Sequence, residues 1–191
     1  MQNDFKNWCI EKHKESNHFY DDYLPYEFHL RLMHKVAKQF QELWETTIKI
    51  IDRGCPFWII EDACFAYDLI GDTKTSYNQI LRQLEFFYPN EKKGCLAIAE
   101  IAKACTNFGR SRIRDERMPD FVYEDIVKTP GAIFVKLADR IANVEYSNLT
   151  KSSMGQMYMR ENGRFKTKLY QSPYQPMWDY LDQLFQVIKI D

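Results

Sequence analysis

The stretch AIFVKLADRIANVE, residues 132–145, decides the fold expected of this chain. Its apolar side chains recur with a helical period and are expected to pack: Ile133, Val135, Leu137 and Ile141. Asp139 and Asn143 are four residues apart, and residues at that spacing lie on one face of a helix. The stretch therefore predicts a buried helix that presents an acid and an amide to one pocket, as a metal-plus-nucleotide site requires. An Asp-Arg pair near the end of an ordinary helix has the same spacing, so both interpretations stay open at this point.

Helical periodicity continues through most of the chain. It predicts helices over 4–15, 26–52, 57–70, 76–88 with Thr75 or Ser76 as its cap, 95–105, 119–129, 132–147, a stretch capped by Ser152 or Ser153 that runs through 170, and 177–189. No alternation of apolar and polar residues lasts long enough to predict a sheet, and there is no internal repeat. We therefore expect an all-α orthogonal helical bundle, formed as a single domain over residues 1–191. Residues 152–191 are expected to cover the core; a dimer contact through Trp178 would leave the same pattern, so a homo-oligomer stays open.

Composition limits the classes of partner. The chain has 191 residues, a formal net charge of −1 and 45% hydrophobic residues, which fits a folded domain and gives no electrostatic reason to expect nucleic acid. No apolar run is long enough to span a bilayer, and the N-terminus lacks the pattern of a secretory signal. We expect a soluble, cytoplasmic protein with no nucleic-acid or membrane partner. The five cysteines include no CxxC pair, so reduced and packed thiols are expected.

Two segments upstream accompany this stretch. They are PYEFHLRLMHKVA at 25–37 and FAYDLIGDTKTSYNQI at 65–80, and VKLADRIANV at 135–144 completes the set. In this order the segments resemble the signatures of the HD-domain metal-dependent phosphohydrolases, roughly PYxxH, HDxxED(T) and (I/V)KLADRxxN. The subgroup that they resemble most is the RelA/SpoT-type (p)ppGpp hydrolases and their small stand-alone relatives. The resemblance implies an HD-type bundle and hydrolysis of a pyrophosphorylated nucleotide.

The resemblance also implies a metal site. His29 matches the first histidine of the family, Asp68 the aspartate of its His-Asp pair, and Asp139 its final aspartate. In the family such a set binds one divalent ion, usually Mn²⁺, which polarises a phosphate oxygen and activates water. Asp72 matches an acid that works near the attacking water, so Asp68 and Asp72 are the expected catalytic acids.

Two positions depart from the family pattern. Tyr67 stands where the second histidine belongs, and a phenol with a pKa of about 10 is a poor metal ligand at neutral pH. Metal binding through His29, Asp68 and Asp139 alone is therefore expected to be weakened. Gly71 replaces a glutamate, and a general acid or base is worth roughly 10²–10⁴ in rate. A plain helix C-cap at Gly71, before a turn, fits the local sequence equally well.

Other residues are candidates for ligand contact. Asn143 matches a nucleotide-contacting asparagine of the family, and Arg140 its neighbouring arginine, which could equally form a structural pair with a carboxylate. Tyr20, Tyr23 and Tyr26 could stack on a base or fill the gap between the first two helices. His34 is expected outside the site. Four arginines could meet phosphates or lie on a solvated loop: Arg110, Arg112, Arg114 and Arg117.

Two functions from different classes follow. The first is metal-dependent hydrolysis of a pyrophosphorylated nucleotide such as (p)ppGpp, with Asp72 orienting water and with Asn143 and Arg140 holding the nucleotide. The second is a catalytically degenerate protein that binds or sequesters a nucleotide on the same fold, which Tyr67 and Gly71 motivate. A purely structural adaptor is a third interpretation, but it does not explain acids placed within apolar helices, where unpaired charges are costly.

Overall fold

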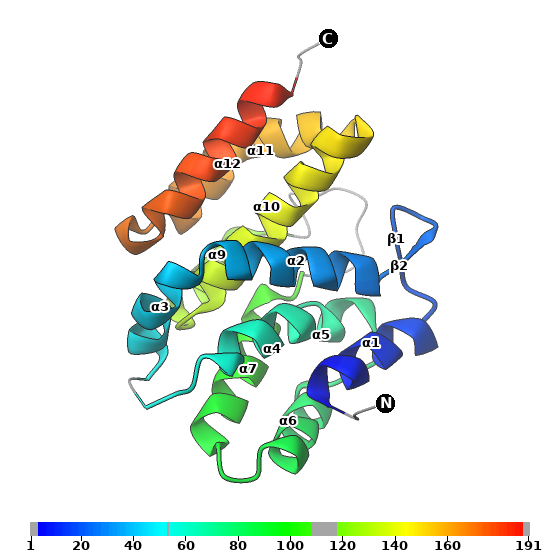
Figure 1. The fold of residues 1–191 in the computed structure, drawn as a ribbon, viewed down its shortest axis with the longest axis vertical. Helices are drawn as coiled ribbons and strands as arrows, with labels where there is room; N and C mark the ends of the chain where they lie inside the picture. Colours follow the sequence, from blue (N-terminus) through cyan, green and yellow to red (C-terminus); the bar gives the residue numbers. More distant parts are fainter. Residues whose placement is uncertain (1–3, 53, 108–117, 189–191) are drawn as a thin grey trace.

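The computed structural model describes residues 4–52, 54–107 and 118–188 of the chain. Its helices (Figure 1) are α1 Phe5–Glu15, α2 Glu27–Gln39, α3 Trp44–Ile51, α4 Trp58–Ala66, α5 Leu69–Asp72, α6 Tyr77–Phe87, α7 Lys92–Cys105, α9 Asp120–Lys128, α10 Ala132–Thr150, α11 Met154–Leu169 and α12 Gln175–Val187. Two 3₁₀ turns, Gln41–Leu43 and Ser172–Tyr174, precede α3 and α12. Across the described residues the fold is all-α apart from one short hairpin, as the sequence predicted.

That hairpin, between α1 and α2, was not predicted. It pairs β1 Phe19–Tyr20 with the antiparallel β2 Leu24–Pro25. Asp21 and Asp22 form its turn with φ angles of 52° and 64°, in the left-handed region that aspartate tolerates better than most side chains. Strands of two residues are too short to leave an alternating pattern, so periodicity could not reveal them.

Helix α10 runs through the middle of the molecule and contacts α2, α4, α7, α9, α11 and α12 (Figure 1). The side chains predicted to pack on it are all buried: Ile133, Val135, Leu137 and Ile141. The helix begins after Gly131, which has a φ of 84°, and a Cβ there would lie 2.8 Å from Ile51 Cδ1. Only glycine meets both conditions, so the start of α10 is closely packed against Ile51 at the end of α3.

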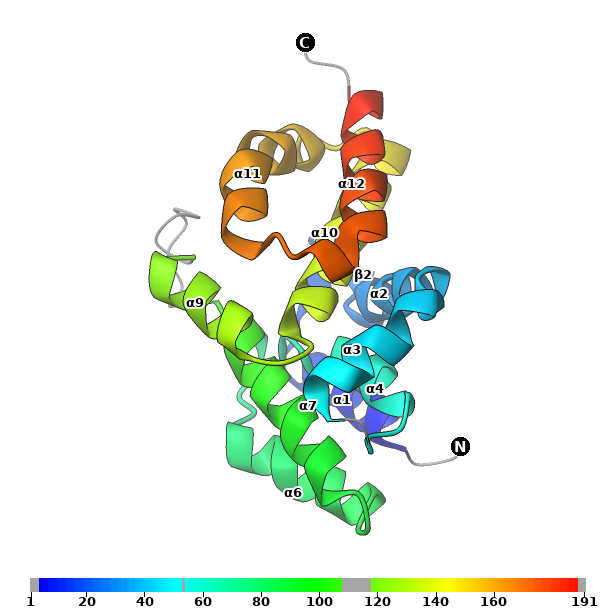
Figure 2. The ribbon, with the colours of Figure 1, turned by 90° about the vertical axis from the view of Figure 1, so that its left-hand side faces the viewer.

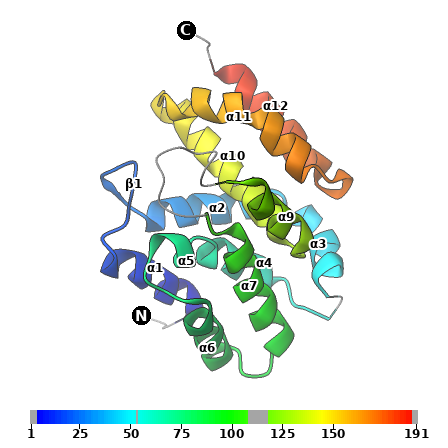
Figure 3. The ribbon, with the colours of Figure 1, turned by 180° about the vertical axis from the view of Figure 1, so that it is seen from behind.

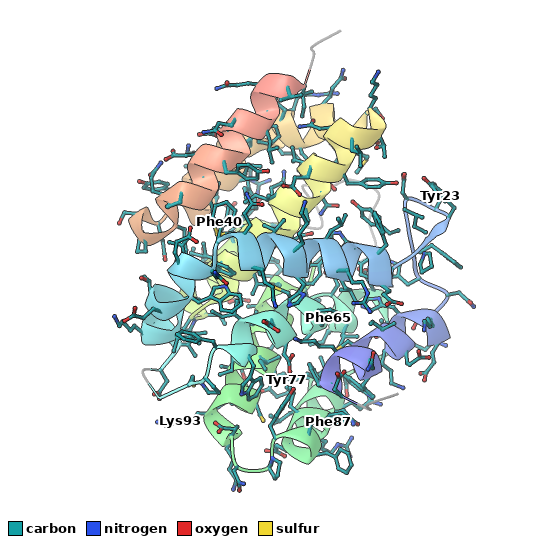
Figure 4. The ribbon with its side chains drawn as sticks, in the orientation of Figure 1. Tyr23, Phe40, Phe65, Tyr77, Phe87 and Lys93 are labelled. Atoms are coloured by element: carbon teal, nitrogen blue, oxygen red, sulfur yellow. The ribbon has the colours of Figure 1, made fainter. Side chains whose placement is uncertain are left out.

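The remaining helices lie toward the two ends of α10. Figure 2 shows α11 and α12 near one end and α6 and α7 near the other, and Figure 3 shows α9 close to α7 and α10. The C-terminal helices cover the core as predicted, because the Phe165 and Trp178 rings lie 5.6 Å apart and both side chains are fully buried. Trp178 itself is therefore not available for a dimer contact, and a homo-oligomer formed through its neighbours stays a prediction. Figure 4 places Phe65 in the interior and Tyr23, which is 66% exposed, at the outer edge of the hairpin.

The predicted helix over 26–52 is in fact two helices. It ends at Gln39, because Phe40 leaves helical geometry with φ −108° and ψ 33°. The Trp44 indole N–H donates a 2.9 Å hydrogen bond to the Ala37 carbonyl at this point, so the start of α3 is joined to the end of α2. Neither glycine nor proline marks the break, so no local pattern predicts it.

The predicted helix over 57–70 is also interrupted. It stops at Ala66 and restarts at Leu69, again without glycine or proline at the break. Tyr67 and Asp68 form the junction between α4 and α5, and both side chains are buried. This junction brings the second signature segment against α2 and α10.

Helices α6 and α7 start as local chemistry suggests. Ser76 caps α6, as one of the two predicted caps, and forms a reciprocal capping box with Gln79. Helix α7 begins at Lys92, earlier than predicted, so Gly94 lies inside it. A Cβ at Gly94 would lie 2.8 Å from Ile59 Cδ1, so this glycine allows α7 to approach α4 closely.

Two general expectations can be compared with the structure. The five cysteines are free and buried, as predicted. Burial raises the pKa of the Cys105 thiol to about 12, which makes thiolate chemistry unfavourable there. In the ranges that the structure describes, no helix has the length and apolar character needed to cross a membrane.

Candidate functional site

The three signature segments meet at one cleft of about 150 Å³. Its lining residues come from the hairpin and from helices far apart in the chain: Tyr20, Tyr26, His29, Tyr67, Asp68, Asn107, Met118, Lys136, Asp139, Arg140, Asn143 and Tyr158. The predicted metal ligands His29, Asp68 and Asp139 are among them, and so are the predicted nucleotide contacts Asn143 and Arg140. The fold therefore brings together the residues that the sequence singled out in separate segments.

The Tyr67 hydroxyl lies among the buried polar groups of this cleft. Its oxygen is 2.7 Å from His29 Nε2, 3.2 Å from Asp139 Oδ1 and 3.0 Å from the Tyr26 hydroxyl. Burial, and after it the negative charges of Asp139 and Asp68, raises the pKa of Tyr67 well above its usual value. Tyr67 is therefore a neutral hydroxyl that donates one hydrogen bond and accepts others.

Asp139 is surrounded by donors and by a cation. Its Oδ1 lies 3.2 Å from His29 Nε2 and accepts from Asn143 Nδ2 at 2.6 Å. Its Oδ2 lies 3.3 Å from the ammonium nitrogen of Lys136. Burial alone would raise the pKa of Asp139, but Lys136 and His29 lower it overall. Asp139 is therefore a stable carboxylate at neutral pH.

Asp68, in the same cleft, has the opposite behaviour. The Tyr26 hydroxyl donates a short hydrogen bond to its Oδ2. Burial, followed by the charge of Asp72, raises the pKa of Asp68 to about 7. The protonated form of Asp68 is therefore favoured more strongly than that of an exposed aspartate.

The residues present do not fit a divalent metal as they are arranged. His29 Nε2 and Asp139 Oδ1 are 3.2 Å apart, as two ligands of one ion can be, but the Tyr67 hydroxyl is hydrogen-bonded to both atoms. Asp68, the third predicted ligand, is bonded to the Tyr26 hydroxyl. Within the described part of the chain, no three His, Cys, Asp or Glu side chains form a group that could hold a metal ion. A Mn²⁺ ion placed here would have to displace a buried hydroxyl.

Asn143 is held on both sides of its amide. Its Nδ2 donates to the Asp139 carboxylate and, at 2.9 Å, to the Asp139 backbone carbonyl. Its Oδ1 accepts from the Tyr20 hydroxyl at 3.0 Å. The Tyr20 ring also stacks on the His29 ring, with centroids 4.7 Å apart. The hairpin thereby closes one side of the cleft.

Arg140 forms the structural pair that was one of its two expected roles. Its Nη2 lies 3.3 Å from a Glu161 carboxylate oxygen, and its Nη1 donates to the Tyr158 carbonyl at 3.4 Å. The guanidinium also lies over the Tyr158 and Phe165 rings, 4.7 Å and 4.3 Å from their centroids. Contact with a nucleotide stays a prediction, supported only by the position of Arg140 in the cleft lining.

Asp72 and Gly71 are not among the residues that line this cleft. The Asp72 carboxylate is 3.8 Å from His18 Nε2, so its proposed action on a water stays a prediction. The interpretation of Gly71 as a helix C-cap is wrong, because α5 continues to Asp72 and the cap is Thr73. A Cβ at Gly71 would meet Thr106 Cγ2 at 3.5 Å, an ordinary contact.

Sequence reasoning missed two functional features of the cleft. Lys136 is 7% exposed and lines it, and the available signal was a charged residue between Val135 and Leu137 in an apolar run. Tyr26 was considered only for stacking or filling, yet it hydrogen-bonds to Asp68. No local pattern in the sequence signals that bond, since its partners are 42 positions apart.

A second cleft of about 240 Å³ adjoins the first and shares Tyr20, Asn143 and Tyr158 with it. Its other lining residues are Asp21, Asp22, Tyr146, Ser147, Ser152 and Met154. His34 lies elsewhere, as expected, 3.2 Å from Glu61. The four arginines considered for phosphate contact lie outside the described residues: Arg110, Arg112, Arg114 and Arg117.

Comparison with known proteins does not identify the chain: no protein-family model, no curated protein and no solved structure matches it. Membership of the HD family therefore stays a prediction that rests on the three sequence segments.

Proposed function

We propose that the protein is a catalytically degenerate relative of the HD-type hydrolases that binds a pyrophosphorylated nucleotide such as (p)ppGpp. The observation that carries this proposal is the position of the Tyr67 hydroxyl. It is hydrogen-bonded to His29 and Asp139, two of the side chains that a metal would need, and to Tyr26, which engages Asp68. Binding needs only the cleft and its polar groups, whereas metal-dependent cleavage needs those ligands to be available.

The polar lining supports nucleotide binding in particular. Asn143 presents an amide that Asp139 and Tyr20 orient, and an amide that is already oriented loses little entropy when it meets a ligand. Arg140 and Lys136 add positive charge to the same lining, which suits an anionic group such as a pyrophosphate.

Metal-dependent hydrolysis is the second candidate. The 3.2 Å separation of His29 Nε2 and Asp139 Oδ1 favours it, because two ligands of one ion lie about this far apart. It requires the Tyr67 hydroxyl to leave its position. Mn²⁺ would then act as a Lewis acid on a phosphate oxygen, with His29, Asp68 and Asp139 as its ligands.

Titration of the protein with ppGpp in a calorimeter, combined with an assay of pyrophosphate release, tests both candidates. The binding function predicts saturable binding and no pyrophosphate release, with or without millimolar Mn²⁺. The Asn143→Ala variant should bind roughly twofold to tenfold more weakly, because Asn143 Oδ1 can still accept one hydrogen bond from the ligand and a neutral hydrogen bond is worth about 0.5–1.5 kcal/mol.

Asn78→Ala is the matched control, because Asn78 is an exposed amide on α6 away from the cleft. It should bind ppGpp like the natural protein. Release of pyrophosphate that depends on Mn²⁺ would instead establish the hydrolase. Absence of any ppGpp binding would contradict both candidates.

A further inference from the structure

The Lys136 ammonium is an unusual group to find buried at this position. Its side chain is 8% exposed and lines the cleft next to Tyr67. It forms an ion pair with Asp139 at 3.3 Å and lies 5.7 Å from the centre of the Tyr67 ring. Among the residues that the structure describes, these are the polar and ring contacts that Lys136 makes. An ammonium has three donors, so it can still donate to a ligand in the cleft.

The other cation of the cleft is more fully occupied. Arg140 is engaged by Glu161, by the Tyr158 carbonyl and by two aromatic rings. Its charge is therefore largely balanced within the protein. Among the described residues of this lining, the Lys136 ammonium is engaged by fewer groups than the Arg140 guanidinium, and it keeps hydrogens that can bind an anion.

The charges of the cleft leave little attraction for a divalent ion. The Asp139 carboxylate is already balanced by Lys136, and Asp68 is engaged by the Tyr26 hydroxyl. An added ion would meet the ammonium of Lys136 as a like charge and would have to displace the hydroxyl of Tyr67. Both effects act against metal binding, whereas an anion is attracted by the Lys136 ammonium and does not need the atoms that the Tyr67 hydroxyl engages.

We propose that this cleft binds the phosphate end of its ligand without a divalent metal, with the Lys136 ammonium as the cation and the Tyr67 hydroxyl excluding metal from His29 and Asp139. This deepens the function proposed above and rests on it for the identity of the natural ligand. Lys136 donates to phosphate oxygens through the hydrogens that Asp139 does not engage. The Tyr67 hydroxyl hydrogen-bonds to the His29 imidazole and to the Asp139 carboxylate, so neither group is available to a metal ion.

The metal half of the proposal is tested by direct titration with Mn²⁺, followed by electron paramagnetic resonance of the free ion. The natural protein should take up no Mn²⁺ in the millimolar range. The Tyr67→His variant should take up one ion per chain, with a dissociation constant for Mn²⁺ at least tenfold lower than that of the natural protein. Tyr67→Phe removes the hydroxyl without adding an imidazole, so its affinity for Mn²⁺ should be lower than that of Tyr67→His. Stoichiometric uptake by the natural protein would overturn the proposal.

The anion half is tested with inorganic pyrophosphate in the presence of excess chelator. The natural protein should bind it, and Lys136→Met should bind at least tenfold more weakly. Because Lys136→Met leaves Asp139 unpaired and can unfold the chain, the double variant Lys136→Met with Asp139→Asn removes both charges together. The double variant should stay folded and bind at least tenfold more weakly than Asp139→Asn alone, because the two variants differ only in the Lys136 ammonium. Equal binding by the double variant and the natural protein would overturn the role of Lys136.

The two proposals fail in different ways. If pyrophosphate binds under chelation but ppGpp binds no better than pyrophosphate, the metal-free anion site stands and the proposed nucleotide function fails. If ppGpp binds only when Mn²⁺ is present, nucleotide binding stands and the metal-free mode is wrong.

Discussion

The two walls of the cleft shift the pKa of a buried carboxyl group in opposite directions. On the α10 wall, Asp139 faces a cation, an imidazole and an amide, and its pKa is lowered. On the wall formed by the α4–α5 junction, Asp68 faces a tyrosine hydroxyl, and burial together with Asp72 raises its pKa to about 7. Burial acts on both carboxyls in the same direction, so the difference comes from the partners.

This difference shows what a buried acid needs in order to stay charged. A hydroxyl can donate only one hydrogen bond and carries no net charge, so it offsets little of the cost of burial. An ammonium supplies both a donor and a full charge. The α10 wall is therefore ionic and the junction wall nearly neutral, which gives the cleft one strong cation–anion pair beside a proton-sharing cluster.

The largest loss of stability is expected when one charge is removed from the α10 wall. Lys136→Met should lower the free energy of unfolding by about 3–5 kcal/mol, because Asp139 is then a buried charge without its cation. Urea unfolding followed by circular dichroism measures this. Lys35→Met is the matched control: Lys35 is 66% exposed and lies 3.5 Å from Glu145, so its loss should cost about 0–1 kcal/mol. Equal losses in the two variants would contradict the ionic description.

A substitution in the wall formed by the α4–α5 junction should cost less stability. Tyr26→Phe removes the hydroxyl that serves Asp68 and Tyr67, and it should cost about 1–3 kcal/mol because buried polar groups lose a partner. The same unfolding experiment measures the change. Tyr170→Phe, whose hydroxyl bonds to exposed Gln175, should change stability by no more than about 0.5 kcal/mol. A cost for Tyr26→Phe as large as that for Lys136→Met would remove the contrast between the walls.

The pH dependence of stability sharpens the comparison. The folded-state pKa of Asp68, about 7, lies above its unfolded value of about 3.9, so the folded state binds more protons between these values. The contribution of Asp68 is therefore most favourable below about pH 4 and declines as the pH rises toward 7, by at most about 1.4 kcal/mol per pH unit.

Asp68→Asn should remove this decline. The difference in unfolding free energy between the natural protein and the variant, measured from about pH 5 to about pH 8, isolates Asp68. Other buried groups with shifted pKa values, such as Asp62 and His13, are present in both proteins and cancel. A difference that does not change with pH would mean that Asp68 is ionised throughout, like Asp139.

The smallest expected effect is at Gly71, next to the junction wall. Gly71→Ala should stabilise the protein by up to about 1 kcal/mol, because the residue lies inside α5 and a Cβ would make only an ordinary contact with Thr106. Thermal unfolding measures the gain. A loss of stability would indicate that the backbone at this position needs glycine.

Local rules predicted the parts of the fold that depend on local chemistry. The apolar period of α10 and the capping residue Ser76 were both visible in the sequence. The breaks at Phe40 and at Tyr67 were not, because no glycine or proline marks them and tertiary packing overrides the continuous helical period. The two-residue strands of the hairpin were too short to detect.

The site was predictable as a set of residues but not as an arrangement. Asp139 and Asn143 share a helix face, as their spacing required, and hydrogen-bond to each other. That Tyr67 would reach both His29 and Asp139 depends on how three distant elements pack, which no local pattern encodes. The resemblance indicated that Tyr67 departs from the family pattern, and the structure shows which groups its hydroxyl contacts.

Tyr67 also has a consequence for how such a cleft can change over generations. Lys136, Asp139, Arg140 and Asn143 all belong to α10, while Tyr67 comes from a separate element at the α4–α5 junction. Every tyrosine codon becomes a histidine codon through the replacement of one base. A single nucleotide change would therefore exchange the phenol for an imidazole while leaving the four α10 residues unchanged. On this scaffold, a cleft that excludes a metal ion and a cleft with a further metal ligand would therefore differ by one mutation.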